Sequence, residues 1–449
     1  MGDFMEKKIE TGNGPEIYWY PNCHTHSFCL SLYIRAGCIY ESGRDNGITH
    51  FMEHMVFRSI NRHMDGRMYQ ILDEKGLYFN GATYKEFIQL YIIGAPQHFT
   101  EAADILLKVF EPFCLSAEDI GTEQQRVKSE IREAGDLKSL DHFAGTFVWE
   151  NTNTANTILG TKGNVSRFTG KRMESYRKDV LRRGNVFLYV TGNVSEKDIG
   201  ELSEKAQRCR LSAERPPENN CVEVPCSFMA RPCRVYVKSS EYYMVQFSFD
   251  FMTKRYTTAE LALLYDILFS GENSLVHQEL SEKRGWIYSY TSALEKYSNI
   301  GRIYFSYEIG KKRLQDSVAL VFRALSALLD EETLSERLLW VLPEYTDNAY
   351  MIYDDNEGFN WQRAYECHIM GEDYKTIEAG KSAFEAVTLR RLLQIVKEIF
   401  RRENLVLSMK GRKQQIDTAG IEELIAGFGR TDTKTDADCL GKDGGFCES

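Results

Sequence analysis

The fold is decided by one stretch of sequence, Gly47-Ile48-Thr49-His50-Phe51-Met52-Glu53-His54-Met55-Val56-Phe57. On a helix, His50 and His54 stand one turn apart on the same face, so both imidazoles reach one metal ion. Glu53 lies beside them, where a general base for a metal-activated water is needed. Because a catalytic zinc takes three protein ligands and keeps one position open, we expect a third ligand elsewhere in the chain.

The third ligand is expected on a helix at about 116–136, which carries two glutamates on one face. Glu123 and Glu130 are seven residues apart, or two helical turns. This pair offers the candidate third ligand, and Glu133, one turn beyond Glu130, is either the fallback ligand or a surface carboxylate. Glu123 could instead be no more than an exposed helix charge.

These two motifs resemble the M16 metallopeptidases, the family of insulinase, pitrilysin and the mitochondrial processing peptidase. His-x-x-Glu-His is followed by Glu-x6-Glu, and the interval from His54 to Glu130 fits that family. The resemblance implies that His50, His54 and Glu130 bind one zinc ion. It also implies that Glu53 is the catalytic base and that Glu123 orients a histidine.

Length and composition bound the remaining possibilities. The 449 residues are too many for one ordinary core, which predicts two or more domains. The net charge of −10 argues against nucleic-acid binding, which needs a basic face. No apolar run follows the N-terminal charges and no apolar stretch is long enough to span a membrane, so we expect a cytoplasmic enzyme. The eleven cysteines have no paired C-x-x-C spacing and are expected to be reduced.

The sequence patterns divide the chain into two copies of one unit. A strand expected at 404–411 corresponds to one at 185–192, and only the first copy contains His-x-x-Glu-His. We expect an α+β fold with two tandem homologous domains, each a mainly antiparallel sheet packed with helices, which face each other across a cleft. The expected parts are a zinc-binding domain at 1–212, a proline-containing linker at 213–232, a second domain without a metal site at 233–430 and a disordered tail at 431–449.

Residues 77–93 predict a strand pair or one long bent strand. In the M16 family the matching region offers an edge strand to the substrate, so the resemblance implies that Asn80, Gly81, Ala82 and Thr83 bind the peptide backbone. The extra glycine between Asn80 and Ala82 departs from the family pattern and leaves the register of that pairing open. The alternative is a plain sheet strand.

The second half shows a further departure from the family. M16 peptidases take from it an arginine that binds the substrate backbone and, seven residues later, a tyrosine that stabilises the oxyanion. Tyr288 occupies the tyrosine position, but Ser281 stands at the arginine position, and Arg284 is about one turn displaced. The departure predicts a heterodimer in which a metal-less homologous partner supplies the arginine–tyrosine pair, with a homodimer as the second choice. The alternative for Tyr288 is an ordinary strand aromatic.

The combined reading predicts a zinc endopeptidase with one zinc per chain. It would cleave short or unfolded peptides inside an enclosed chamber formed by two facing chains. Its substrates are either a ribosomally made, modified peptide or peptides in general turnover. The competing classes are a non-catalytic scaffold subunit of the same fold and a peptide-binding chaperone that keeps zinc. The intact base and three ligands favour the enzyme.

Overall fold

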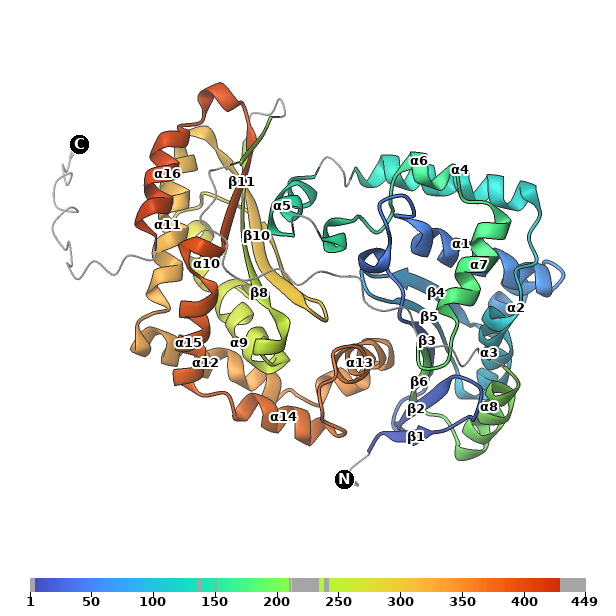
Figure 1. The fold of residues 1–449 in the computed structure, drawn as a ribbon. Coiled ribbons are helices and arrows are strands. Elements are labelled where there is room, and N and C mark those ends of the chain that lie inside the picture. The colour runs from blue at the N-terminus through green and yellow to red at the C-terminus, as the bar shows by residue number, and fades with distance from the viewer. Residues whose placement is uncertain are drawn as a thin grey trace, which may run out of the picture.

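The computed structural model describes residues 5–135, 139–149, 152–209, 211, 234–237 and 242–428. The expected linker at 213–232 and the expected tail at 431–449 lie outside these residues. The described chain forms two lobes, each with one sheet and one hydrophobic core (Figure 1).

The first sheet has six strands in the order β1-β2-β6-β3-β5-β4, so β4 lies at its edge. Only β2 and β6 run parallel, and the other neighbours are antiparallel. The strands are β1 (Lys7–Ile9), β2 (Glu16–Pro21), β3 (Phe28–Ile34), β4 (Tyr78–Thr83), β5 (Ile88–Gly94) and β6 (Val186–Gly192). Residues 77–93, expected as a strand pair or one long bent strand, form the pair β4 with β5.

The second sheet repeats this topology. Its five described strands follow the order β7-β11-β8-β10-β9, with one parallel pair, β7 with β11. The strands are β7 (Arg234–Val237), β8 (Tyr242–Met252), β9 (Tyr290–Lys296), β10 (Ile300–Gly310) and β11 (Leu405–Gly411). Position by position, β9 corresponds to the edge strand β4, and β11 corresponds to β6. The prediction of two tandem α+β units with mainly antiparallel sheets is confirmed.

Helices cover the first sheet, and two of them carry the predicted metal ligands. They are α1 (Ile48–His63), α2 (Met68–Lys75), α3 (Phe99–Leu106), α4 (Ala117–Ala134), α6 (Lys162–Val165), α7 (Gly170–Val180) and α8 (Glu196–Arg208). α4 begins at a capping box, in which Ser116 and Asp119 each bond the other's backbone N–H. It ends at Gly135, whose φ of 61° is in the left-handed region that stops helices.

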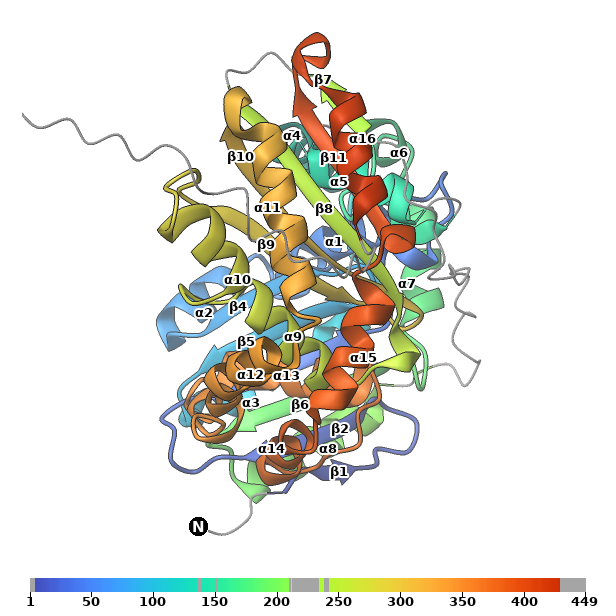
Figure 2. The same cartoon turned by 90° about the vertical axis from the view of Figure 1, so that its left-hand side faces the viewer.

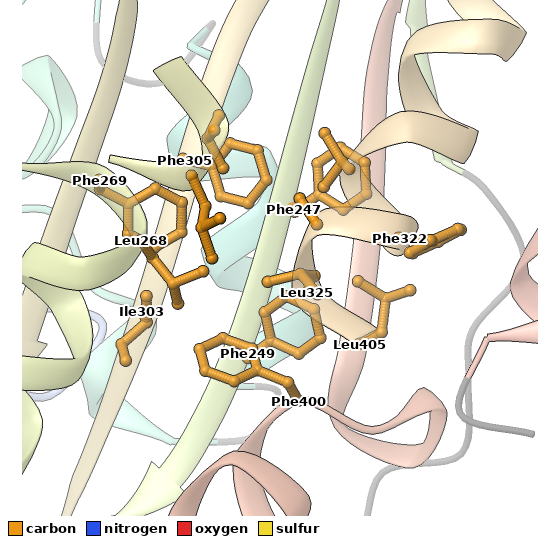
Figure 3. Close-up of a cluster of buried hydrophobic side chains, with 14 of the residues drawn as sticks. Phe247, Phe249, Leu268, Phe269, Ile303, Phe305, Phe322, Leu325, Phe400 and Leu405 are labelled. Atoms are coloured by element: carbon orange, nitrogen blue, oxygen red, sulfur yellow. The ribbon is translucent and has the colours of Figure 1, made fainter. Parts of the chain in front are cut away.

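The helices of the second lobe lie on the outer side of its strands, as Figure 2 shows for α11, α15 and α16. They are α9 (Thr258–Phe269), α10 (Leu275–His277), α11 (Leu314–Ala327), α12 (Glu331–Thr346), α14 (Ile377–Glu385), α15 (Leu389–Ile399) and α16 (Thr418–Gly427). The core between them and the sheet is rich in aromatic rings (Figure 3). Phe247 and Phe305, on neighbouring strands, stack with ring centroids 4.8 Å apart.

Short helical turns join the main elements. The 3-10 turns are η1 (Cys38–Tyr40), η2 (Pro96–His98), η3 (Leu107–Phe110), η5 (Asn153–Ala155), η6 (Thr253–Arg255), η8 (Lys311–Arg313), η9 (Met351–Asp354), η11 (Arg402–Asn404) and η12 (Lys413–Gln415). Two π-helical segments are η7 (Gln278–Glu282) and η10 (Ala364–Ile369). Among the described helices, none has the length and apolar character that a membrane span requires.

Two helices pack against the sheet of the opposite half. α5 (Leu140–Val148) lies on β8 and β11, and α13 (Asn356–Arg363) lies on β3 and β6 (Figure 1). Asn360 of α13 is fully buried, accepts a hydrogen bond from the Tyr33 hydroxyl at 2.9 Å and donates one to the Tyr189 carbonyl at 3.1 Å. Each sheet is therefore covered by helices from both halves, and separating the halves would expose apolar surface on both sheets.

Candidate metal centre

The predicted metal ligands meet between two packed helices of the first lobe. α1 carries His50 and His54, and α4 carries Glu130. The Nε2 atoms of His50 and His54 lie 3.6 Å and 3.4 Å from the Glu130 Oε2. One donor atom from each residue falls within 4.8 Å of the other two. The fallback Glu133 points elsewhere: its side chain is 74% exposed and lies beside Arg132.

This donor set fits a zinc ion. Two imidazoles and one carboxylate are zinc ligands in catalytic sites. Burial, together with the neighbouring His54, lowers the pKa of His50 to about 3. Its ring is therefore neutral at neutral pH, which is the form that coordinates metals. The His50 Nδ1 is buried and has no hydrogen-bond partner among the described residues.

A buried carboxylate orients the second histidine. Glu123 accepts a hydrogen bond from His54 Nδ1 at 3.1 Å, which directs the Nε2 toward Glu130. Burial alone would raise the pKa of Glu123, but the hydrogen bonds from His54 and Arg58 outweigh it and lower that pKa. Burial also opposes protonation of His54, but its bond to Glu123 and the charge of Glu130 outweigh this and raise its pKa.

Arg58 holds this carboxylate from behind. Its Nε donates to the Glu123 Oε1 at 2.8 Å, its Nη2 donates to the same oxygen, and its Nη1 donates to Asp119 Oδ1 at 3.2 Å. Arg62 reaches the same Asp119 oxygen at 2.8 Å. The hydrogen bonds from Arg62 are the largest cause of the lowered pKa of Asp119. Because Arg58 binds the Oε1 of Glu123, its Oε2 is directed at His54.

A glutamate from a preceding loop holds the start of the metal helix. Gly47, the residue before α1, has no side chain to cap the helix. Glu41 is buried and replaces such a cap: it accepts hydrogen bonds from the backbone N–H of Gly47 at 2.7 Å and of Thr49 at 2.9 Å. His50 lies in this first turn, so Glu41 helps to place it.

Glu53 faces the edge strand β4. Thr83, at the end of β4, donates a hydrogen bond from its hydroxyl to Glu53 Oε2. Burial raises the pKa of Glu53, and the Thr83 bond offsets part of that rise. Gly81 lies so close that a Cβ there would stand 3.0 Å from Glu53 Oε1 and 2.9 Å from the Phe57 ring. The extra glycine of the sequence therefore lets β4 approach the motif.

The four predicted substrate-binding residues all lie on β4 in continuous pairing with β5, where Gly81 opposes Leu90. Gly81 and Thr83 face Glu53, while Asn80 and Ala82 alternate to the other side. Asn80 donates a hydrogen bond to the Tyr78 hydroxyl at 2.8 Å. The outer edge of β4 pairs with no other strand among the described residues.

The structure does not bring the second-half residues into this cluster. Tyr288 lies in the loop between η7 and β9, is 97% exposed, and makes no hydrogen bond among the described residues. Arg284 donates to the carboxylate of Glu279 at 2.8 Å. Ser281 lies within the π-helical segment η7.

The sequence reading missed Arg58, Asp119 and Glu41 as supports of the site. The first two carried a usable signal, because Arg58 follows His54 by four residues and Asp119 precedes Glu123 by four, so each pair shares a helix face. Glu41 carried none, since its contact depends on how a loop folds back onto α1.

Comparison with known families and structures identifies the family of this chain. Residues 20–162 match the family model "Insulinase (Peptidase family M16)", and residues 167–339 match "Peptidase M16 inactive domain". A Bacillus subtilis protein named "Uncharacterized zinc protease YmxG" is 22% identical over 399 residues, which are 88% of this chain and 96% of that protein. The human mitochondrial-processing peptidase subunit beta is 25% identical over 212 residues, 46% of this chain and 42% of that one.

Solved structures show the same fold. A protease from Helicobacter pylori superposes with a TM-score of 0.81 at 16% identity, covering 91% of this chain and 100% of that one. The two family models follow one another along the chain and together span most of it. The chain therefore belongs to peptidase family M16, the family that its metal-binding motif resembles.

Proposed function

We propose that this protein is a zinc-dependent endopeptidase. The observation that carries the proposal is the convergence of His50, His54 and Glu130 within 4.8 Å, with Glu53 between this cluster and an edge strand. Relatives from Bacillus subtilis and Rickettsia felis are named zinc proteases, which supports the same activity here. One zinc per chain is expected, because the described second half has no comparable cluster.

The substrate is an extended peptide. An edge strand offers unpaired backbone N–H and C=O groups, and a peptide added along β4 would satisfy them with little regard to its sequence. Gly81 and Thr83 face Glu53, so such a peptide would pass in front of the base. Short or unfolded chains meet this requirement and folded domains do not.

The chemistry divides between the metal and Glu53. When bound, zinc supplies the Lewis acidity that activates water and polarises a peptide carbonyl. Glu53 accepts the proton of the attacking water and donates it to the leaving amine. Its raised pKa suits both steps, and the Thr83 hydroxyl fixes the direction of its carboxylate. Glu123 keeps the Nδ1 proton of His54 in place throughout.

The side chains that stabilise the oxyanion are proposed to come from a partner chain. Tyr288 is solvent-exposed and Arg284 is bound to Glu279, so Tyr288 and Arg284 do not form an arginine–tyrosine pair beside the metal centre among the described residues. We propose a heterodimer with a homologous, metal-less chain, which together would enclose a chamber; a homodimer is the second choice. A relative is named as a subunit of the mitochondrial processing peptidase. The cytoplasmic location and the modified-peptide substrate stay predictions.

Glu53→Gln tests the proposal directly. The variant keeps the shape of the side chain and its bond from Thr83 but cannot take a proton. We expect bound zinc to be unchanged, because Glu53 is not among the three clustered donors, and we expect peptide cleavage to fall by more than a thousandfold. The assay is zinc content by atomic absorption together with cleavage of an unfolded peptide library, with and without the partner chain.

The control is Glu133→Gln, which removes an exposed glutamate outside the cluster and should change neither readout. If the wild-type chain binds zinc but cleaves no peptide with or without the partner chain, the protein is a scaffold or a peptide-binding subunit of the same fold. Full activity of the chain alone would instead overturn the proposed heterodimer.

A further inference from the structure

Residues 152–160 lead from the second sheet back to the start of the metal helix, and we call them the crossing segment. They follow α5, which packs on β8 and β11 of the second half, and they precede α6, which packs on α1 and α4 of the first half (Figure 1). Within the crossing segment, η5 packs against η1. The crossing segment contains none of the three clustered metal ligands.

The crossing segment begins at a side chain that is buried in the second half. Trp149, at the end of α5, is 1% exposed and packs with Ile300 and Val406 of the second sheet. Its carbonyl accepts hydrogen bonds from the backbone N–H of Thr152 at 3.1 Å and from the Thr152 hydroxyl at 2.8 Å. A displacement of Trp149 on the second sheet would therefore move the start of the crossing segment.

The crossing segment is also bonded to the residues that follow the edge strand. The Lys85 Nζ donates a hydrogen bond to the carbonyl of Thr154, a fully buried residue, at 2.6 Å. Lys85 follows Thr83 by two positions, and Thr83 is the residue that bonds to Glu53. Two extended residues span at most about 7 Å, so Thr154 is linked to the proposed path of the peptide by a short stretch of chain.

Asn156 bonds the crossing segment to the loop before the metal helix. Its Nδ2 donates to the carbonyls of Cys38 and Glu41, both at 3.0 Å. The Glu41 carboxylate in turn accepts from N–H groups at the start of α1, where His50 lies in the first turn. Asn156 is therefore connected to a metal ligand through one residue, Glu41.

The backbone of the crossing segment also packs directly on the start of α1. A Cβ on Gly160 would lie 2.3 Å from the carbonyl oxygen of Asn46 and 2.6 Å from the Cα of Gly47. The Asn46 side chain donates to the carbonyl of Thr157 at 2.7 Å and to Glu41 at 2.9 Å. Backbones in such close contact have little room to move independently of one another.

We propose that the crossing segment is a positioning element through which the packing of the second half sets the geometry of the metal centre, and that Asn156 is its positioning residue. The second half then contributes to zinc binding, although the three clustered ligands all belong to the first half. The inference rests on the proposed zinc site. It gives the second half a role that does not depend on Tyr288.

Val406→Ala tests the connection from the second half. The change removes two methyl groups from the cluster around Trp149. Val318→Ala is the matched control, because Val318 is equally buried in the second half but lies on α11 in the other core cluster. Both variants are expected to lose stability in urea, since each leaves a small cavity.

Only Val406→Ala is expected to change the first half. Competition with a chelating dye should show zinc binding at least about threefold weaker than in the wild type. Amide hydrogen exchange of the metal-free chain should be at least about threefold faster in the first turn of α1 and in β4. Val318→Ala should match the wild type in both measurements.

Asn156→Asp tests the positioning residue. Aspartate keeps the shape of the side chain but cannot donate to the carbonyls of Cys38 and Glu41. Asn153→Asp is the matched control, because it adds the same charge to the same segment and the Asn153 side chain makes no hydrogen bond among the described residues. We expect a shifted visible absorption spectrum for Co²⁺-loaded Asn156→Asp protein, since that spectrum reports ligand geometry, and a wild-type spectrum for Asn153→Asp.

Equal zinc affinity and equal hydrogen exchange in Val406→Ala and Val318→Ala would overturn the positioning element. A wild-type Co²⁺ spectrum in Asn156→Asp would overturn the role of Asn156. If one of these two variants does not fold, the other decides the question. A wild-type chain that binds no metal would refute the proposed zinc enzyme, and hydrogen exchange of the metal-free variants would still decide whether the second half positions α1 and β4.

Discussion

Replacing Arg58 by methionine is expected to weaken zinc binding, although Arg58 donates no bond to any of the three clustered ligands. Arg58 directs two of its nitrogens to the Glu123 Oε1, and Glu123 in turn receives the Nδ1 proton of His54. Methionine keeps most of the aliphatic stem but removes the guanidinium. Glu123, whose side chain is 2% exposed, then keeps His54 and the distant Arg126 as partners.

The size of the effect follows from these contacts. Loss of an outer partner that orients a metal-binding histidine lowers metal affinity by about 10- to 100-fold. Breaking a buried charge pair costs about 3–5 kcal/mol, and since the Arg58 side chain is 26% exposed we expect about 3 kcal/mol of unfolding free energy. Asp119 is affected less, because Arg62 and Ser116 still bond to it.

Two measurements separate the effects. Competition with a chelating dye gives the zinc affinity, and urea unfolding in the presence of chelator gives the stability of the metal-free chain. Arg126→Met is the matched control, because Arg126 reaches the same carboxylate at 3.4 Å but is 59% exposed. Such exposed pairs contribute about 0–1 kcal/mol, and we expect less than a twofold change in zinc affinity.

The reasoning would be refuted by Arg58→Met protein that loses stability but binds zinc as tightly as the wild type. In that case Glu123 would hold His54 without help. Equal effects of Arg58→Met and Arg126→Met would show that only the net charge near α4 matters, and not the buried hydrogen bonds.

Three further predictions concern other parts of the structure. Glu41→Ala leaves two buried N–H groups at the start of α1 without an acceptor, so we expect a loss of about 1–3 kcal/mol per group in urea unfolding, together with weaker zinc binding. Glu86 is buried and accepts hydrogen bonds from Ser298 of the other half, and burial raises its pKa. The protonated carboxyl therefore stabilises the fold fully below the unfolded pKa, and this stabilisation is lost as pH rises through the folded pKa. Glu86→Gln should therefore gain thermal stability relative to the wild type as pH rises from 5 to 8, and a constant difference would contradict this. Asn360→Leu removes the side-chain acceptor of the buried Tyr33 hydroxyl and leaves it only the backbone carbonyl of residue 360 at 3.4 Å, so we expect a cost of about 1–3 kcal/mol in urea unfolding. A neutral result would mean that the Asn360 side chain does not hold α13 in place.

The sequence was most informative where geometry is local. The spacing of His50, Glu53 and His54 determines their arrangement on any helix, because four residues make about one turn. Residues 77–93 predicted either a strand pair or one long bent strand, and the structure shows the pair, β4 with β5. The correspondence of 185–192 with 404–411 predicted the repeated unit, which the structure shows as β6 and β11 in equivalent places. The distance from His54 to Glu130 along the chain became meaningful through the family resemblance.

The supports of the site were less visible in the sequence. Arg58 and Asp119 stand at helical spacing from His54 and Glu123, but charged residues at that spacing are common on solvated helix faces. Only the structure shows that they bond to each other across two helices, with Asp119 buried. Gly81 departs from the family pattern, and the close approach of Glu53 gives the physical reason for a glycine there.

What the sequence by itself determined is the chemistry of the metal ligands, the two-unit α+β architecture and the absence of the His-x-x-Glu-His motif from the second unit. Only the tertiary structure decided that α5 and α13 each pack on the sheet of the opposite half and that Glu41 caps α1. The physical reason is that an amphipathic pattern states which face of a helix is buried but not which sheet buries it. Contacts between residues hundreds of positions apart, such as Tyr33 with Asn360, depend on that choice of sheet and have no local signal in the sequence.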